Sequence, residues 1–146
     1  MTDKRVTLFV EDEPDDILLI TRAINKANFK SPIINVNDGE QALAYLKGDP
    51  PYDDREKTPL PALILLDLKL PRTSGFEILS WIREQPATQC IPVVVLTSSK
   101  DSADIRRAYE IGANSYLVKP VVPDDVQNMI KTLGLYWLVL NEYPVT

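Results

Sequence analysis

The chain has 146 residues, of which 45% are hydrophobic and 25% charged, and its formal net charge is −5 at pH 7. This length suits one globular domain with a single substantial core, and the composition does not indicate large-scale disorder. The 16 basic residues are scattered and outnumbered by 21 acidic ones, which disfavours a nucleic-acid-binding protein.

Two residue types narrow the chemistry. The chain has no histidine, which removes serine–histidine and cysteine–histidine catalysis, histidine-ligated zinc and a phosphohistidine on the chain itself. The single cysteine, Cys90, excludes an internal disulfide and agrees with a reducing compartment. No apolar stretch is long enough to cross a bilayer and no signal-type segment follows Met1, so we expect a cytoplasmic protein without membrane contact.

Five β-type runs alternate with five helical patterns. The runs cover residues 5–10, 32–36, 62–66, 92–96 and 115–118. The helical patterns begin at Pro14, near Asp38, after Gly75, near Ser102 and near Pro123. This alternation predicts right-handed βαβ units, a parallel sheet with helices on both faces, and a single domain over residues 1–146. Residues 48–61, rich in proline and charge, predict a polar surface loop.

The last helical pattern continues beyond the length that one domain needs. Its apolar stripe runs through Ile130 and Leu133 to Tyr136, Trp137 and Leu140. We interpret residues 134–146 as an extension of the last helix and a tail. We expect this region to form a homodimer, and the alternative is a tail that folds back onto its own domain.

Acidic residues close two of the predicted strands. Asp67 follows five apolar residues that predict a strand buried on both faces, so its carboxylate should lie at the strand's carboxyl end, where open α/β sheets bind ligands. Glu11 and Asp12 close the first strand, although a solvated turn would also explain them. If these strands are neighbours, three carboxylates converge, and their repulsion favours a divalent cation such as Mg²⁺ or Mn²⁺. We interpret Asp15 and Asp16 as acids that only stabilise the first turn of a helix.

The last two strands bring a hydroxyl and an ammonium to the same edge. Thr97 closes the fourth strand, and Lys119 follows the fifth and precedes Pro120. Taken separately, each is typical of a cap or a solvated side chain. Together with the acids, they are the groups needed to bind Mg²⁺ and stabilise a transferring phosphoryl group.

The order of these motifs resembles that of the response-regulator receiver domain of two-component signalling. The motifs are Glu11-Asp12, Asp67 followed by Lys-Leu-Pro and Ser-Gly, Thr97, Tyr116 and Lys119-Pro120. The resemblance covers nearly the whole chain. It implies a flavodoxin-like fold with strand order 2-1-3-4-5 and a cis bond between Lys119 and Pro120. The loop at 48–61 and the ending Tyr136-Trp137-Leu138 also resemble the stand-alone receivers that are partnered with phytochrome-type histidine kinases.

The resemblance also assigns roles to the site residues. Asp67 is the expected phosphorylation site, with phosphohistidine on a partner kinase as donor. Glu11, Asp12, Asp67 and the backbone carbonyl of Lys69 are the expected Mg²⁺ ligands. Lys119 pairs with Asp67 and then with the phosphoryl group. Thr97 and Tyr116 are the expected switch, and they change the face formed by the fourth helix, fifth strand and fifth helix.

Lys69 and Ser99 lie two residues after Asp67 and Thr97, at positions that influence how water reaches an acyl phosphate in this family. On this reading the chain is not an enzyme, apart from slow self-catalysed phosphotransfer and autodephosphorylation.

Three other functions compete with this one. A receiver-like module could act through contacts that are independent of phosphorylation. A flavodoxin binding FMN would need a Ser/Thr/Gly-rich phosphate loop after the first strand, where this chain has Glu11-Asp12-Glu13. A Mg²⁺-dependent phosphohydrolase would usually carry a second Asp at the position of Lys69.

Overall fold

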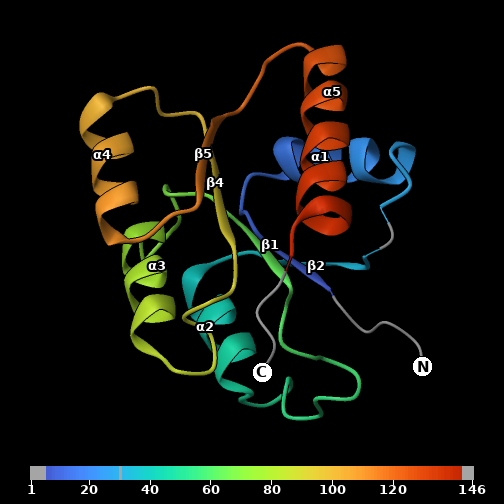
Figure 1. Ribbon diagram of the computed structural model, residues 1–146. Coiled ribbons are helices and arrows are strands. Elements are labelled where there is room, and N and C mark those ends of the chain that lie inside the picture. Colours follow the sequence, from blue (N-terminus) through green and yellow to red (C-terminus); the bar gives the residue numbers. More distant parts are fainter. Residues whose placement is uncertain (1–5, 30, 143–146) are drawn as a thin grey trace.

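A computed structural model describes residues 6–29 and 31–142. Strands and helices alternate along the chain (Figure 1) in the order β1 Thr7–Val10, α1 Pro14–Lys26, β2 Ile33–Val36, α2 Gly39–Lys47, β3 Leu63–Leu66, α3 Gly75–Glu84, β4 Val93–Thr97, α4 Ser102–Ile111, β5 Ser115–Val118, α5 Pro123–Gly134 and the π-helix η1 Leu135–Leu140. The five predicted strands and five predicted helices are confirmed. The predicted start of the first strand, Arg5, lies outside the described residues.

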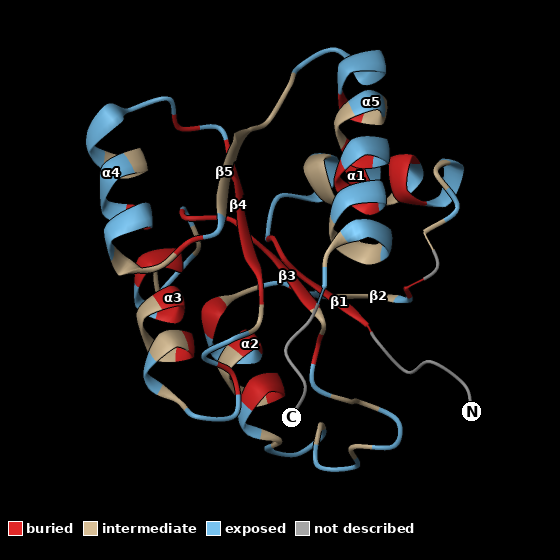
Figure 2. Cartoon of the chain, viewed as in Figure 1, coloured by how far each residue is buried: buried red, intermediate tan, exposed pale blue. Residues whose placement is uncertain are grey.

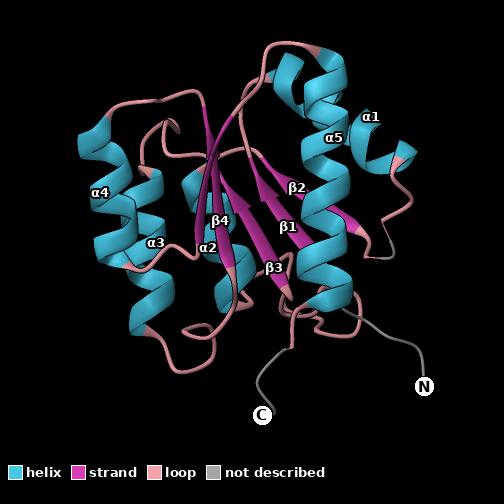
Figure 3. Ribbon diagram, turned by 45° about the horizontal axis from the view of Figure 1, so that its top comes forward, coloured by secondary structure: helices cyan, strands magenta, loops and turns pink. Residues whose placement is uncertain are grey.

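The strands form one parallel sheet in the order β2-β1-β3-β4-β5. Helices α1 and α5 cover one face, and α2, α3 and α4 cover the other (Figures 1 and 3). This is the predicted flavodoxin-like fold. The chain leaves β1 toward β2 on one side and later returns to β3 on the other, so the strand order reverses beside β1. In open α/β sheets such a switch point is where ligands bind, outside the carboxyl ends of the strands.

The strand register brings the carboxyl ends of the central strands level. Val10 at the end of β1 lies beside Leu66 at the end of β3, and Leu66 lies beside Val95 of β4. The residues that follow β1 and β3 therefore emerge at the same edge of the sheet, next to the end of β4.

The core lies on both faces of the central strands, whose residues are buried while the outer helix faces are exposed (Figure 2). Strand β3 supplies both halves of the core. Ile64 and Leu66 pack with α2 and α3 on one face, and Leu63 and Leu65 pack with α1 and α5 on the other. This explains why the sequence of β3 is continuously apolar rather than alternating.

Side-chain caps fix where several helices begin. Asp38, Ser74 and Asp101 precede α2, α3 and α4, and each accepts a hydrogen bond from a backbone amide in the first turn. Helices α1 and α5 instead begin with Pro14 and Pro123, which suit the first helical position.

The loop at 48–61 contains no helix or strand, as predicted, but it is tied to α2. The Arg55 guanidinium donates hydrogen bonds to the backbone oxygens of Tyr45 and Leu46 at the carboxyl end of α2 and to that of Thr58. The Tyr45 hydroxyl donates to the Pro59 oxygen at 2.7 Å. The loop is therefore packed against the edge of the sheet opposite to the carboxyl ends of the strands.

The predicted cis bond between Lys119 and Pro120 is wrong. Among the described residues, the cis peptide bond lies between Pro50 and Pro51, and Lys119–Pro120 is trans. The trans form is intrinsically favoured even before proline. The Lys119 amide, which precedes this bond, continues the pairing of β5 with β4 by donating to the Thr97 oxygen at 2.8 Å.

The last helix changes its winding at its carboxyl end. Gly134 packs directly against Phe29, where an added Cβ would lie 2.4 Å from the ring. From Leu135 the backbone continues as η1 rather than as the predicted extension of the α-helix. Trp137 and Leu138 pack onto the core beneath α1 and α5, whereas Tyr136 is half exposed. Residues 143–146 of the predicted tail lie outside the described residues. In the part of the chain that is described, no helix combines the length and apolarity needed to span a membrane.

Candidate functional site

Three carboxylates converge at the carboxyl edge of the sheet. Glu11 and Asp12 follow β1, Asp67 follows β3, and one oxygen of each lies within 4.8 Å of the others. The strand pairing continues past the strand ends, since the Asp67 amide donates to the Val10 oxygen at 3.1 Å. Glu11 is fully buried, Asp67 is 5% exposed and Asp12 is exposed. The predicted meeting of these three residues is confirmed.

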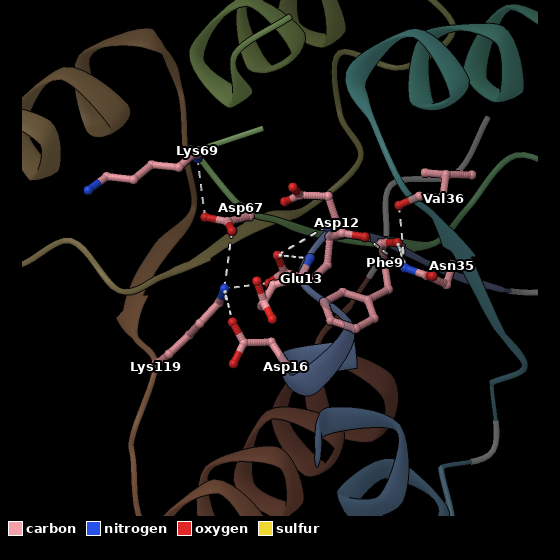
Figure 4. A network of polar contacts seen from close by, with 10 residues as sticks. Phe9, Asp12, Glu13, Asp16, Asn35, Val36, Asp67, Lys69 and Lys119 are labelled. Atoms are coloured by element: carbon pink, nitrogen blue, oxygen red, sulfur yellow. Dashed lines mark hydrogen bonds and ion pairs between the residues drawn. The ribbon is translucent and has the colours of Figure 1, made fainter. Parts of the chain in front are cut away.

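Lys119 brings a positive charge to this cluster from the end of β5. Its ammonium donates a hydrogen bond to Asp67 Oδ2 at 3.1 Å and one to Asp16 Oδ2 at 2.8 Å. It also forms an ion pair with Glu11 Oε1. Figure 4 shows the ammonium between Asp16 and Asp67. The predicted contact of Lys119 with Asp67 is present. The carboxylates of Glu11 and Asp16 contact the same ammonium.

Burial and neighbouring charges have opposite effects on the pKa values of Glu11 and Lys119. Burial raises the pKa of Glu11 to about 7, against the opposing influence of the Lys119 ammonium. Burial alone would lower the pKa of Lys119, but hydrogen bonds to Asp16 and Glu11 and the charge of Asp67 outweigh it and hold that pKa above its ordinary value. Lys119 is therefore positively charged at neutral pH, and it is the cation that stabilises this acidic cluster in the structure.

The loop between β3 and α3 holds the Asp67 carboxylate in place. The Lys69 amide donates to Asp67 Oδ1 at 3.3 Å, so each oxygen of Asp67 has a donor. Gly75 at the start of α3 packs against the backbone of this loop, and a Cβ there would lie 2.3 Å from the backbone carbonyl oxygen of Asp67. Only glycine permits this approach. The Lys69 side chain is exposed, and ligation by its backbone carbonyl stays a prediction.

Thr97 is the last residue of β4 and carries a hydroxyl to the edge of the sheet where the carboxylates meet. The side chain is fully buried, and its Oγ finds no hydrogen-bond partner among the described residues. Buried hydroxyls normally have a partner, so one without a partner at a ligand-binding edge marks a position at which a polar ligand atom would be stabilised.

Tyr116 and Ser99 connect this edge to α4. The Tyr116 side chain is half-buried, and its hydroxyl donates to the Ser99 oxygen at 3.0 Å. The Ser99 hydroxyl in turn donates to Asp104 Oδ2 of α4 at 2.7 Å. The loop that follows Thr97 is thus bonded to β5 on one side and to α4 on the other.

The acidic cluster fits a hard divalent cation. Three carboxylates within 4.8 Å of one another supply more negative charge than the single ammonium of Lys119 offsets. Their ligand atoms are all oxygens, which suits Mg²⁺ or Mn²⁺ rather than a metal that prefers nitrogen or sulfur. Asp12 is the exposed member, so the cluster opens toward solvent on that side.

Asp16 is the site residue that the sequence interpretation missed. It was assigned only to the first turn of α1, yet it contacts the Lys119 ammonium. The spacing of residues in α1 could have indicated that Asp16 faces the sheet. Asp16 precedes Ile20 and Ile24 at intervals of four residues, and both isoleucines are buried against the sheet. Residues at this spacing share one face of a helix, so Asp16 had to lie on the inward face.

Comparisons with known proteins agree with this geometry. Residues 7–131 match the family model described as "Response regulator receiver domain". The chain is 39% identical over 142 residues to the probable methanogenesis regulatory protein FilR2 of Methanothrix harundinacea, which covers 97% of this chain and 89% of that protein. It is 37% identical over 134 residues to the response regulator Rcp1 of Synechocystis sp., with coverage of 92% and 89%.

Solved structures show the same similarity. The crystal structure of the Mn²⁺-bound form of Rcp1 matches with a TM-score of 0.86 at 35% identity, over 97% of this chain and 99% of that one. The crystal structure of the phosphorylated cyanobacterial phytochrome response regulator RcpA matches with a TM-score of 0.87 at 32% identity, again over 97% and 99%.

Proposed function

The chain belongs to the response regulator receiver domain family, and on this premise we propose that it is a phosphoacceptor signalling protein whose Asp67 receives a phosphoryl group from a partner histidine kinase. The observation that carries the proposal is the convergence of Glu11, Asp12 and Asp67 within 4.8 Å, with the Lys119 ammonium bonded to Asp67. The protein acts by changing its contacts and not as a classical enzyme.

The transfer follows from the groups at the site. A carboxylate oxygen of Asp67 attacks the phosphorus of a phosphohistidine on the kinase. The new P–O bond forms as the P–N bond breaks, and the bonding electrons leave with the imidazole, which takes up a proton. The product is an acyl phosphate on Asp67. Because this chain has no histidine, the donor must belong to another protein.

Glu11, Asp12, Asp67 and the backbone carbonyl of Lys69 are proposed to hold Mg²⁺, for which Mn²⁺ can substitute. When bound, such an ion supplies positive charge that draws in the phosphoryl oxygens and offsets charge that develops during transfer. Lys119 adds a fixed positive charge beside Asp67. The description of Rcp1 as Mn²⁺-bound supports the choice of ion.

The phosphoryl group is proposed to act on Thr97 and Tyr116. It adds roughly −1.5 to −2 charges and strong acceptor oxygens next to the Thr97 hydroxyl, which has no partner in the described part of the chain. Movement of Thr97 to donate to these oxygens frees space for Tyr116, whose hydroxyl already bonds the same loop at Ser99. The face formed by α4, β5 and α5 then changes shape and binds its target differently.

We propose a phytochrome-type histidine kinase as the donor, supported by the description of RcpA as a phytochrome response regulator. The whole chain would act as one receiver unit in the cytoplasm, with residues 134–146 as its extension. A second copy of the chain is proposed to pack on Leu135, Tyr136, Val139 and Leu140, each more than half exposed. Slow self-catalysed phosphotransfer from small donors and slow autodephosphorylation complete the proposal.

Incubation with acetyl phosphate and Mg²⁺, followed by intact-mass measurement, tests the phosphoacceptor role. We expect one added phosphoryl group on the wild-type chain and none on Asp67→Asn. Asp53→Asn is the matched control, since Asp53 is an exposed aspartate of the loop at 48–61, and it should be modified like the wild type. Turnover of the donor without accumulation would favour a phosphohydrolase. An unmodified wild-type chain would favour an interaction module that is independent of phosphorylation.

A further inference from the structure

Lys119 contacts the carboxylates of Glu11, Asp16 and Asp67, and only two of these belong to the cluster that could bind a metal ion. Glu11 and Asp67 belong to the cluster suited to a divalent cation, and Asp67 is also the proposed phosphoacceptor. Asp16 bonds the same ammonium at 2.8 Å but is not part of that cluster. A cation held by the cluster competes with Lys119 for Glu11 and Asp67, because a carboxylate oxygen directed at a metal is less available to an ammonium. The bond from Asp16 does not face this competition.

The Lys119 side chain is largely enclosed where it meets Asp16. The Lys119 side chain is 10% exposed and that of Asp16 is 34% exposed. Beside them, apolar side chains of α1 and α5, including Leu19, Ile20 and Met129, leave a space of only about 10 Å³. That is at most room for one water molecule. The carbon chain of Lys119 is therefore enclosed, and the position of its ammonium depends on the carboxylates that it meets.

We propose that Asp16 is a positioning residue that holds the Lys119 ammonium beside Asp67 while the phosphoryl group is transferred. The inference rests on the proposed phosphoacceptor role of Asp67. A lysine side chain has many rotamers, and a charge that must sit within hydrogen-bond distance of the reacting carboxylate acts best when it is already ordered. Asp16 orders it from α1, on the side opposite to Asp67 (Figure 4).

The simpler alternative is that Asp16 only stabilises α1 as an acid in its first turn. Asp15 is a matched control for this role, because it lies in the same turn, carries the same charge and is exposed. Within the described residues Asp15 forms no ion pair. A helix effect would be lost equally in Asp15→Ala and Asp16→Ala, whereas a positioning effect would be lost only in the second.

Phosphorylation rates with acetyl phosphate at saturating Mg²⁺ test the proposal. We expect Asp16→Ala to be about five- to tenfold slower than the wild type, Asp16→Asn to be intermediate, and Asp15→Ala to stay within about twofold. In a Lys119→Met background, Asp16→Ala should cause no further slowing, because Asp16 acts through Lys119. Equal rates for the Asp15 and Asp16 variants, or additive slowing in the Lys119→Met background, would overturn the proposal.

A second measurement does not depend on phosphorylation. The Mg²⁺-loaded proteins are treated with an amine-acylating reagent, and the modification of Lys119 is followed by peptide mass. Asp16→Ala should raise the rate at Lys119 several-fold, while Asp15→Ala should not. If the wild type took up no phosphoryl group, the proposed function would fail, but unchanged Lys119 reactivity in Asp16→Ala would still refute the role of Asp16 by itself.

Discussion

Thr97 and Thr7 are both buried threonines of central strands, yet their hydroxyls differ. That of Thr7 is hydrogen-bonded to the Ser31 hydroxyl at 3.1 Å, whereas that of Thr97 has no partner in the described chain. Replacing a hydroxyl by a methyl group of the same shape costs stability only where a hydrogen bond is lost. We therefore expect the Thr97 hydroxyl, unpartnered among the described residues, to add little to the stability of the fold.

Thr97→Val should leave the free energy of unfolding unchanged or slightly higher, whereas Thr7→Val should lower it by about 1 kcal/mol, as measured by urea denaturation. After phosphorylation with acetyl phosphate and Mg²⁺, the ring signals of Tyr116 in NMR spectra should move in the wild type and in Thr7→Val but not in Thr97→Val. A wild-type response in Thr97→Val would show that Thr97 does not transmit the change.

Lys119 stabilises the fold because it neutralises buried carboxylates. Lys119→Met should lower the free energy of unfolding by roughly 2–4 kcal/mol near neutral pH, since it leaves Glu11 buried without its cation. Lys119 lowers the Glu11 pKa, so its loss raises that pKa further. Because the pKa of a glutamate in an unfolded chain is about 4.3, the folded state loses stability as the pH rises from there to the raised pKa.

Urea denaturation of Lys119→Met should therefore show a smaller loss of stability at about pH 5.5 than at about pH 8.5. Lys100→Met, at an exposed lysine, serves as the control and should cost little at either pH. A loss in Lys119→Met that stays the same across this range would mean that carboxylate charge is not its cause.

At the scale of elements, the start of α3 fixes the loop that carries Asp67. Gly75→Ala would place a Cβ 2.6 Å from the Leu68 Cα and even closer to the backbone carbonyl oxygen of Asp67, so the loop must shift. We expect a loss of about 1–3 kcal/mol in unfolding free energy together with slower phosphorylation of Asp67.

Gly48→Ala provides the control for that prediction. Gly48 ends α2 with a φ of 76°, where alanine costs about 1 kcal/mol, but it lies at the edge of the sheet opposite to the site. Gly48→Ala should therefore lower stability while leaving the rate of phosphorylation unchanged. Normal phosphorylation of Gly75→Ala would argue against a positioning role for this turn.

Features that depend on neighbouring residues could be predicted from the sequence, and features that depend on contacts between distant residues could not. β3 could be predicted because its residues face two cores, which requires a continuous apolar run, and its end placed Asp67 correctly. The change to η1 occurs beside a close contact between Gly134 and Phe29. The sequence pattern did not predict that contact, because the two residues are far apart in the sequence. Asp16 was missed because helix-capping preferences explain an acid at that position without reference to Lys119.

At the scale of the whole molecule, the exposed side chains of η1 are the candidate contact between two copies. Leu135, Tyr136, Val139 and Leu140 are 52–61% exposed. Light scattering should give a dimer mass for the full chain and a monomer mass for a chain ending at Leu133. Because truncation also removes Trp137 and Leu138 from the core, Val139→Asp provides a gentler test and should also yield a monomer. Unchanged mass in both variants would exclude this surface as the dimer contact.

We propose that acids from two neighbouring strands hold a divalent cation next to a carboxylate that accepts phosphate. A crystal structure of the protein grown with Mn²⁺ and beryllium fluoride, a phosphoryl mimic, would test this arrangement. We predict an anomalous peak among Glu11, Asp12 and Asp67 and a tetrahedral group on Asp67 that contacts Lys119 and Thr97. Mn²⁺ bound elsewhere, or a bare Asp67 at saturating beryllium fluoride, would show that this site does not bind the cation or accept the phosphoryl group.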